Sequence, residues 1–161
     1  MRRAENRTNW WLILASVVAG LVLAIMPLPD VVDPFRPDWL LLFVIYWSLR
    51  TPRSAGLAFA TVCGLALDVV KGTILGQYAL GFLFAGFVTH RLQLRMRIFP
   101  IWHQAFTVLM MLGLFQFLTF WIDGITGNAV TTWRRWLPIL TGALLWPAVV
   151  AVMDGLSRTR R

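Results

Sequence analysis

The chain is poor in the residues that most enzymes and disulfide-stabilised proteins rely on. Its 161 residues include one cysteine, two histidines and seven acidic residues. A single cysteine, Cys63, excludes a disulfide framework and a zinc cluster built from cysteines. The two histidines, His90 and His103, do not form an HExxH pair, and no GxSxG sequence occurs. Since no two carboxylates share a predicted helix face, we expect no catalytic residues, no cofactor and no metal.

Charged residues are also scarce, at 14% of the chain, whereas hydrophobic residues make up 58%. A soluble domain carries about 25% charged and about 45–50% apolar residues. Because a soluble domain of this size cannot bury so large an apolar share, the composition predicts a membrane protein. The net charge of +8 raises nucleic acid as a partner. The basic residues are spread over several segments rather than gathered together, however, so we expect no nucleic-acid binding.

Long apolar runs indicate helices that cross the membrane, since about 20 apolar residues span a hydrocarbon core of roughly 30 Å. We expect an all-α, polytopic helical bundle of about six transmembrane helices, forming a single transmembrane domain over residues 1–161 with no soluble domain. The second and third helices are short and meet at a tip with Arg50 and Arg53, so the sequence leaves open whether they span fully. The expected helices cover residues 10–28, 37–50, 54–70, 73–90, 102–122 and 136–154.

The basic residues predict the orientation of these helices. Eleven of the 15 lysine and arginine residues fall on one side, and positive charge gathers on the cytoplasmic side, so both termini are expected in the cytoplasm. No small-residue cleavage site follows the first apolar run, which predicts an uncleaved helix. The segment from His90 to His103 is expected to lie in the interface and contact anionic lipid, with docking of a cytosolic protein as the alternative. The eleven inner residues are Arg2, Arg3, Arg7, Arg50, Arg53, Arg91, Arg95, Arg97, Arg158, Arg160 and Arg161, and the outer four are Arg36, Lys71, Arg134 and Arg135.

A row of small residues marks the third expected helix. Gly56, Ala60 and Gly64 recur every four residues, and Asp68 continues the row. Small residues at this spacing let two helices approach closely in lipid. The row is therefore a candidate groove for a partner helix, or it packs against the protein's own helices. Asp68, which is expected near the outer boundary, either contributes to a functional site there, or pairs with Lys71 or caps the following helix.

Two further positions stand out in the sequence, Arg36 and Pro147. Arg36 either anchors the outer loop beside Asp33 and Asp38 or holds a partner in place. Pro147 lies well inside the last apolar run, beside Trp146, where proline is expected to kink a helix.

Four strings occur in order along the chain and together resemble a known family. They are IMPLPD (25–30), FRPDWLLLFVIYWSL (35–49), GLALDVVKGTILG (64–76) and LWP (145–147). In this combination the chain resembles, over nearly its whole length, the MreD family of rod shape-determining proteins of Gram-negative bacteria. The candidate partner-binding or structural residues from these strings and the small-residue row are Arg36, Pro37, Trp39, Tyr46, Trp47, Gly56, Ala60, Gly64, Asp68, Gly72, Gly76, Trp146 and Pro147.

The resemblance implies a multi-pass component of the cell-elongation (rod) complex in the bacterial inner membrane. It implies direct binding to MreC and, through it, a link to MreB and to RodA with its penicillin-binding transpeptidase. It also implies no catalytic activity, and a fold similar to the substrate-binding subunits of energy-coupling-factor transporters. We therefore expect a non-enzymatic scaffold that supports lateral peptidoglycan synthesis and rod cell shape.

Two alternatives and one question of assembly remain open at this point. The first alternative is a solute-binding or transport subunit of a membrane carrier. The second is the handling of a lipid-linked wall precursor, which would need a basic outer or lateral pocket, and Arg36, Arg134 and Arg135 are available for one. The sequence does not decide whether two copies form a homodimer.

Overall fold

The computed structural model describes residues 2–51, 55–127 and 132–158, and within these ranges all regular structure is helical. This confirms the all-α prediction and its six helices. Arg53, Arg160 and Arg161, which contributed to the predicted orientation, lie outside the described residues, as do residues 128–131 of the loop before the last helix. The α-helices are α1 (Arg2–Ile25), α2 (Trp39–Arg50), α3 (Leu57–Lys71), α4 (Gln77–Ile98), α5 (Ile101–Ile125) and α6 (Leu137–Arg158), with short 3₁₀ helices η1 (Asp33–Phe35) and η2 (Trp133–Trp136).

The short helix α2 lies in the interior of the bundle, in contact with α1, α3, α4 and α6. Nine of its 12 residues are buried, among them Leu41, Leu42 and Val44, which have no exposed surface. A helix that is apolar on every side is buried either in lipid or under other elements. In this fold α2 is covered by its neighbours, which form the surface.

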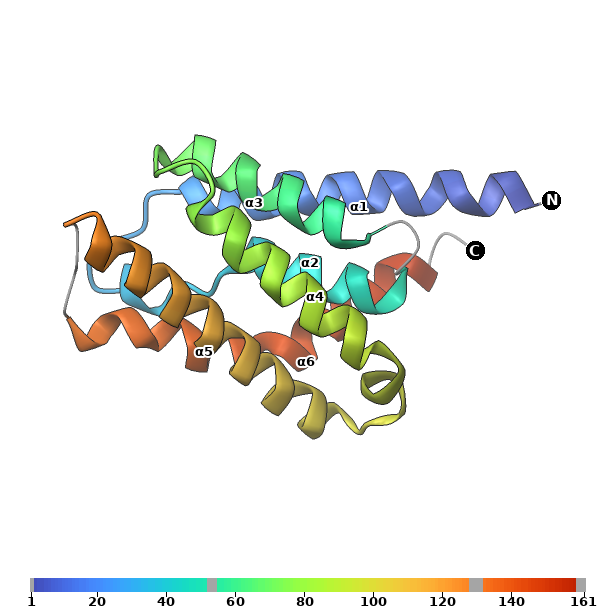
Figure 1. Cartoon of the computed structure of the whole chain (residues 1–161). Helices are drawn as coiled ribbons and strands as arrows, with labels where there is room; N and C mark the ends of the chain where they lie inside the picture. The colour runs from blue at the N-terminus through green and yellow to red at the C-terminus, as the bar shows by residue number, and fades with distance from the viewer. Residues whose placement is uncertain (1, 52–54, 128–131, 159–161) are drawn as a thin grey trace.

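Consecutive helices pack side by side in the outer layer, as short connections favour. α3 lies against α4, α4 against α5, and α5 against α6, while α1 contacts α2 and α3. Figure 1 shows that α1 begins, and α6 ends, at the same end of the bundle. The interior is closed by large side chains, including Phe82 of α4, Phe115 of α5 and Trp146 of α6.

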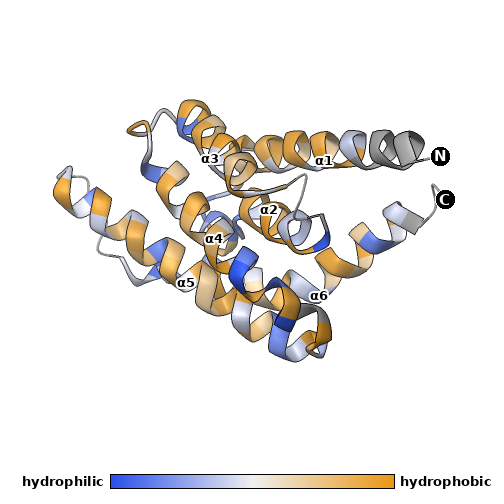
Figure 2. Ribbon diagram, turned by 45° about the vertical axis from the view of Figure 1, so that its right-hand side comes forward, coloured by the Kyte–Doolittle hydropathy of each residue, from blue (hydrophilic) through white to orange (hydrophobic). Residues whose placement is uncertain are grey.

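The outward faces of the helices carry many large apolar side chains. Trp102 and Leu144 are each 81% exposed. Figure 2 shows that hydrophobic residues predominate along α3, α5 and α6. Within the described part of the chain, two helical segments are long and apolar enough to cross a membrane: Ile101–Ile125 and Trp133–Ser157. A third apolar segment, Trp10–Ile25, is shorter. Length and composition thus support two of the six expected spans.

The observed bounds of α4 differ from the expected helix over residues 73–90 at both ends. α4 begins at Gln77, because Gly76 has a φ of +105° and the preceding residues form a loop. It continues to Ile98, because no helix-breaking residue occurs before Pro100. The basic segment that begins at His90 is therefore the end of a long helix and not a separate element.

Candidate functional site

The row of small residues on α3 packs against α4. A Cβ atom added to Gly64 would lie 2.5 Å from the Cα atom of Ala79, and one added to Gly86 would lie 2.9 Å from Cβ of Ala60. Gly56 precedes the first residue of α3 and is half-buried. Because α4 occupies the surface of Ala60 and Gly64, the row is not an open groove. The structure matches the second of the two alternatives, packing against the protein's own helices: the small residues allow the close contact between α3 and α4.

Asp68 closes the loop between α3 and α4. Its side chain is fully buried, and its carboxylate accepts hydrogen bonds from the backbone N–H groups of Gly76 and Tyr78, both at 2.8 Å. It also accepts bonds from the N–H of Ala79 at 3.3 Å and the hydroxyl of Thr73 at 3.1 Å. These are the unpaired N–H groups at the start of α4, where negative charge is stabilising. Asp68 is thus a helix cap, one of the two structural alternatives.

The glycines of this loop have the backbone conformation that the turn requires. Gly72 and Gly76 have φ angles of +64° and +105°, in the region that side chains disfavour. Gly72 ends α3, and its N–H donates to the carbonyl of Val69 at 3.3 Å. These two candidate residues therefore shape the path of the chain between the helices.

Arg36 performs a similar role at the end of α1. Its guanidinium donates to the carbonyl of Ala24 at 2.8 Å and to the carbonyl of Met26, and it forms an ion pair with Asp33 at 3.4 Å. Cationic groups satisfy and stabilise the free carbonyls at a helix C-terminus. Pro37, the next residue, is buried. Arg36 therefore fixes the loop between α1 and α2, and nothing in its geometry requires a partner protein.

The candidate residues of α2 tie this helix to its neighbours. The hydroxyl of Tyr46 donates to Asp154 of α6 at 2.5 Å, and the indole N–H of Trp47 donates to the hydroxyl of Ser16 of α1 at 2.7 Å. Arg50 forms an ion pair with the same Asp154. Buried polar side chains of this kind fix one packing arrangement when their hydrogen bonds are satisfied. Asp154 was missed by the sequence reasoning.

The remaining candidates are packing residues. Trp39 is half-buried, and its ring lies 6.4 Å from that of Phe43. Trp146 has no exposed surface, and its indole nitrogen has no hydrogen-bond partner among the described residues. Pro147 follows it inside α6.

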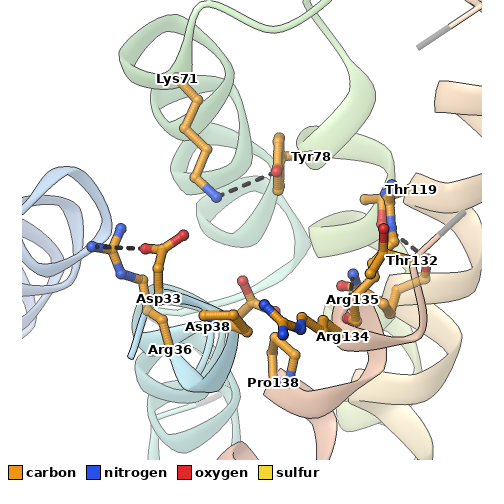
Figure 3. A pocket seen from close by; sticks show the side chains of 12 residues that line it. Asp33, Arg36, Asp38, Lys71, Tyr78, Thr119, Thr132, Arg134, Arg135 and Pro138 are labelled. Carbon is orange, nitrogen blue, oxygen red and sulfur yellow. Dashed lines mark hydrogen bonds and ion pairs between the residues drawn. The ribbon is translucent and has the colours of Figure 1, made fainter. Parts of the chain in front are cut away.

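Three loops meet around a polar cavity of about 330 Å³, which we call the charged cavity. The loops are those between α1 and α2, between α3 and α4, and between α5 and α6. Figure 3 shows their side chains extending toward one space from different elements. The charged residues that line the cavity are Asp33, Arg36, Asp38, Lys71, Arg134 and Arg135. All four basic residues that the sequence assigns to the outer side therefore line one cavity, which the sequence could not show.

The walls of the charged cavity are held by polar contacts. Arg135 forms an ion pair with Asp123, and the amide of Gln77 donates to the same carboxylate at 2.6 Å. Asp38, just before α2, is half-buried. The pKa of its carboxyl is raised above the usual value, because the effect of desolvation is larger than the opposing effect of the positive charges of Lys71 and Arg135.

A second cavity, of about 530 Å³, is apolar and lies mainly between α4 and α5; we call it the apolar groove. Its lining side chains are Leu57, Leu80, Leu83, Phe84, Phe87, Leu118, Trp121, Ile122 and Ile125. Several of them are strongly exposed, including Phe84 at 42% and Trp121 at 60%. Nothing in the sequence reasoning identified this surface, because its residues come from three helices.

Neither cavity is lined by enough described His, Cys, Asp or Glu side chains to form a metal site. Among the residues that the structure describes, no three His, Cys, Asp or Glu side chains lie together in such an arrangement.

Comparison with known proteins gives one consistent result. The family model described as rod shape-determining protein MreD matches residues 5–155. A protein of Haemophilus influenzae named rod shape-determining protein MreD is 28% identical over 150 residues, which cover 93% of each chain. No solved structure matches the chain.

Proposed function

Because the chain belongs to the MreD family of rod shape-determining proteins, we propose that it is a non-enzymatic scaffold of the rod complex in the bacterial inner membrane. In this proposal the six helices form one multi-pass transmembrane domain. The scaffold binds the single-pass protein MreC directly. Through MreC it is connected to MreB, RodA and a penicillin-binding transpeptidase, and so supports lateral peptidoglycan synthesis.

The apolar groove is the observation that carries this proposal. Its walls are nine apolar side chains on the outward side of α3, α4 and α5. Apolar side chains in lipid gain little from the hydrophobic effect, so helices associate there through close packing into complementary surfaces. A recess between two helices can accept the side chains of a third. The groove, rather than the occupied small-residue row, is therefore the proposed contact surface for the helix of MreC.

The arrangement of the ends supports the proposed topology. α1 begins and α6 ends at the same end of the bundle (Figure 1), as an even number of crossings requires. Arg91 and Arg95, near the end of α4, are both exposed. Exposed arginines at a membrane surface attract anionic lipid and favour the cytoplasmic side. We propose on this basis that both termini and the basic end of α4 face the cytoplasm.

Site-directed photocrosslinking in cells tests the proposed contact surface. A photoreactive amino acid would replace Leu83 or Phe87 in the groove, and Leu144 or Val152 on the exposed face of α6 as matched controls. We expect crosslinks to MreC from the two groove positions and few from α6. Equal crosslinking from both faces, or none from the groove, would remove the groove from the proposal.

A solute-binding or transport subunit is the second candidate function. The charged cavity favours it, because a polar recess lined by several cationic groups is a suitable site for a soluble anion. Uptake of a radiolabelled solute into vesicles that contain the protein would support transport. Solute binding without uptake would leave the scaffold as the proposed activity.

A further inference from the structure

The charged cavity brings four cationic side chains close together. Arg36, Lys71, Arg134 and Arg135 reach it from three loops that are far apart in the sequence. Like charges that converge in a partly desolvated recess repel one another, so their convergence costs free energy unless negative charge offsets it. The carboxylates nearby determine whether the protein itself supplies that charge.

Two of the four cations are paired by the protein. Arg36 forms an ion pair with Asp33, and Arg135 forms one with Asp123. Even so, the Nε atoms of both arginines are buried and have no hydrogen-bond partner among the residues that the structure describes. A buried donor without a partner carries a desolvation cost of about 1–3 kcal/mol. The contacts of the described residues therefore do not satisfy every donor of the two paired arginines.

The other two cations are in contact with no carboxylate of the described residues, although Asp38 lines the same cavity and interacts electrostatically with Lys71. Lys71 and Arg134 are exposed, and neither forms an ion pair within the part of the chain that the structure describes. The ammonium of Lys71 instead donates to the hydroxyl of Tyr78 at 3.3 Å and lies 4.5 Å from its ring centroid. Since that hydroxyl accepts from Lys71, its own proton remains available as a donor. Figure 3 shows Lys71 and Arg134 on opposite sides of the cavity.

We propose that the charged cavity binds a phosphate-bearing anion, with Lys71 and Arg134 as its cationic ligands and the hydroxyl of Tyr78 as a further donor. Phosphate oxygens accept several charge-assisted hydrogen bonds at once, which matches a recess rich in ammonium and guanidinium donors. The volume of about 330 Å³ lies within the range of small-ligand sites. The same chemistry is offered by a lipid headgroup and by a soluble phosphate compound. This inference is independent of the proposed contact with MreC.

The first test measures binding of pyrophosphate to the purified full-length chain in detergent, by calorimetry at constant ionic strength. Arg134→Gln and Lys71→Gln each remove one proposed ligand at an exposed position. Arg95→Gln is the matched control, because it removes the same charge from the other end of α4. We expect the Kd to rise about tenfold in each cavity variant, the effect of losing one charge-assisted hydrogen bond. The control should bind as the wild type does.

The second test distinguishes the two sources of phosphate. Native mass spectrometry would compare retention of phosphatidylglycerol with that of zwitterionic phosphatidylcholine by the wild type and the same three variants. Pyrophosphate binding that the cavity variants weaken indicates a soluble ligand. Preferential retention of phosphatidylglycerol that they abolish indicates a lipid headgroup. If neither probe binds, or if Arg95→Gln weakens binding as much as the cavity variants, the proposal is overturned.

Discussion

Gly64 of α3 faces the backbone of Ala79 of α4 so closely that a Cβ atom on Gly64 would lie 2.5 Å from the Cα atom of Ala79. Neither backbone can move without displacing its whole helix. Gly64→Ala is therefore expected to destabilise the fold by about 1–3 kcal/mol, the usual cost of overpacking. Thermal unfolding in detergent, followed by circular dichroism, would measure the change.

Gly113 provides the matched control for this substitution. It lies inside α5, and a Cβ atom there would meet nothing within 4 Å. Gly113→Ala should leave the unfolding midpoint unchanged or raise it slightly, because alanine favours helix more than glycine does. A similar midpoint for the two variants would contradict the close contact between α3 and α4.

Asp68→Asn tests the cap on α4. The carboxylate accepts bonds from three backbone N–H groups and one hydroxyl, whereas an amide has a single acceptor oxygen and no charge. We expect a loss of about 1–2 kcal/mol in the free energy of unfolding, as for other helix caps. Asp30→Asn, at an exposed position of the first loop, should have no effect. Unfolding midpoints that fall equally in both variants would rule out a specific cap.

Tyr46→Phe removes the hydroxyl that joins α2 to Asp154 of α6. Asp154 keeps its ion pair with Arg50, so it is not left without a partner. The expected loss is about 0.5–1.5 kcal/mol, the net value of one hydrogen bond. A double-mutant cycle with Asp154→Ala, which removes the acceptor altogether, measures the coupling between the two residues. Additive effects in that cycle would show that the bond contributes nothing to stability.

Arg36→Gln is expected to loosen the connection between α1 and α2. The guanidinium satisfies the carbonyls of Ala24 and Met26 at the end of α1, and the shorter neutral amide cannot replace both bonds. Hydrogen exchange should become faster at the end of α1 and in residues 26–32, with little change in α5. Arg134→Gln, which removes a charge from the same cavity without affecting these carbonyls, should leave the exchange of that segment unchanged.

Local features of this fold could be predicted from the sequence, and contacts between distant segments could not. The six helices follow from apolar runs that proline and glycine interrupt. A cap formed by Asp68 was one of the alternatives that the sequence offered for this residue, because Gly72 and Thr73 follow within five residues. The pairing of Tyr46 with Asp154 joins residues 108 positions apart. No periodicity within either helix indicates which neighbour it meets.

The small-residue row shows the same limit. Its four-residue spacing correctly indicates close helix contact, but the spacing is identical for an internal neighbour and for a partner. Only the arrangement of α3 against α4 decides between them. For the same reason Arg36, Lys71, Arg134 and Arg135 could be assigned to one side from the sequence, while their convergence on one cavity required the structure.

The burial of α2 has a consequence for how the polypeptide is made. A helix of 12 residues rises about 18 Å, too little to cross a bilayer interior of roughly 30 Å unaided. Part of its surface is covered by α6. The bounds of the two helices show that the ribosome synthesises α6 about 90 residues after α2. Until then α2 lacks part of its final environment. Truncation before α6 should therefore expose α2 to quality-control proteases, although α2 lies in the first third of the sequence and the deleted residues lie at its other end.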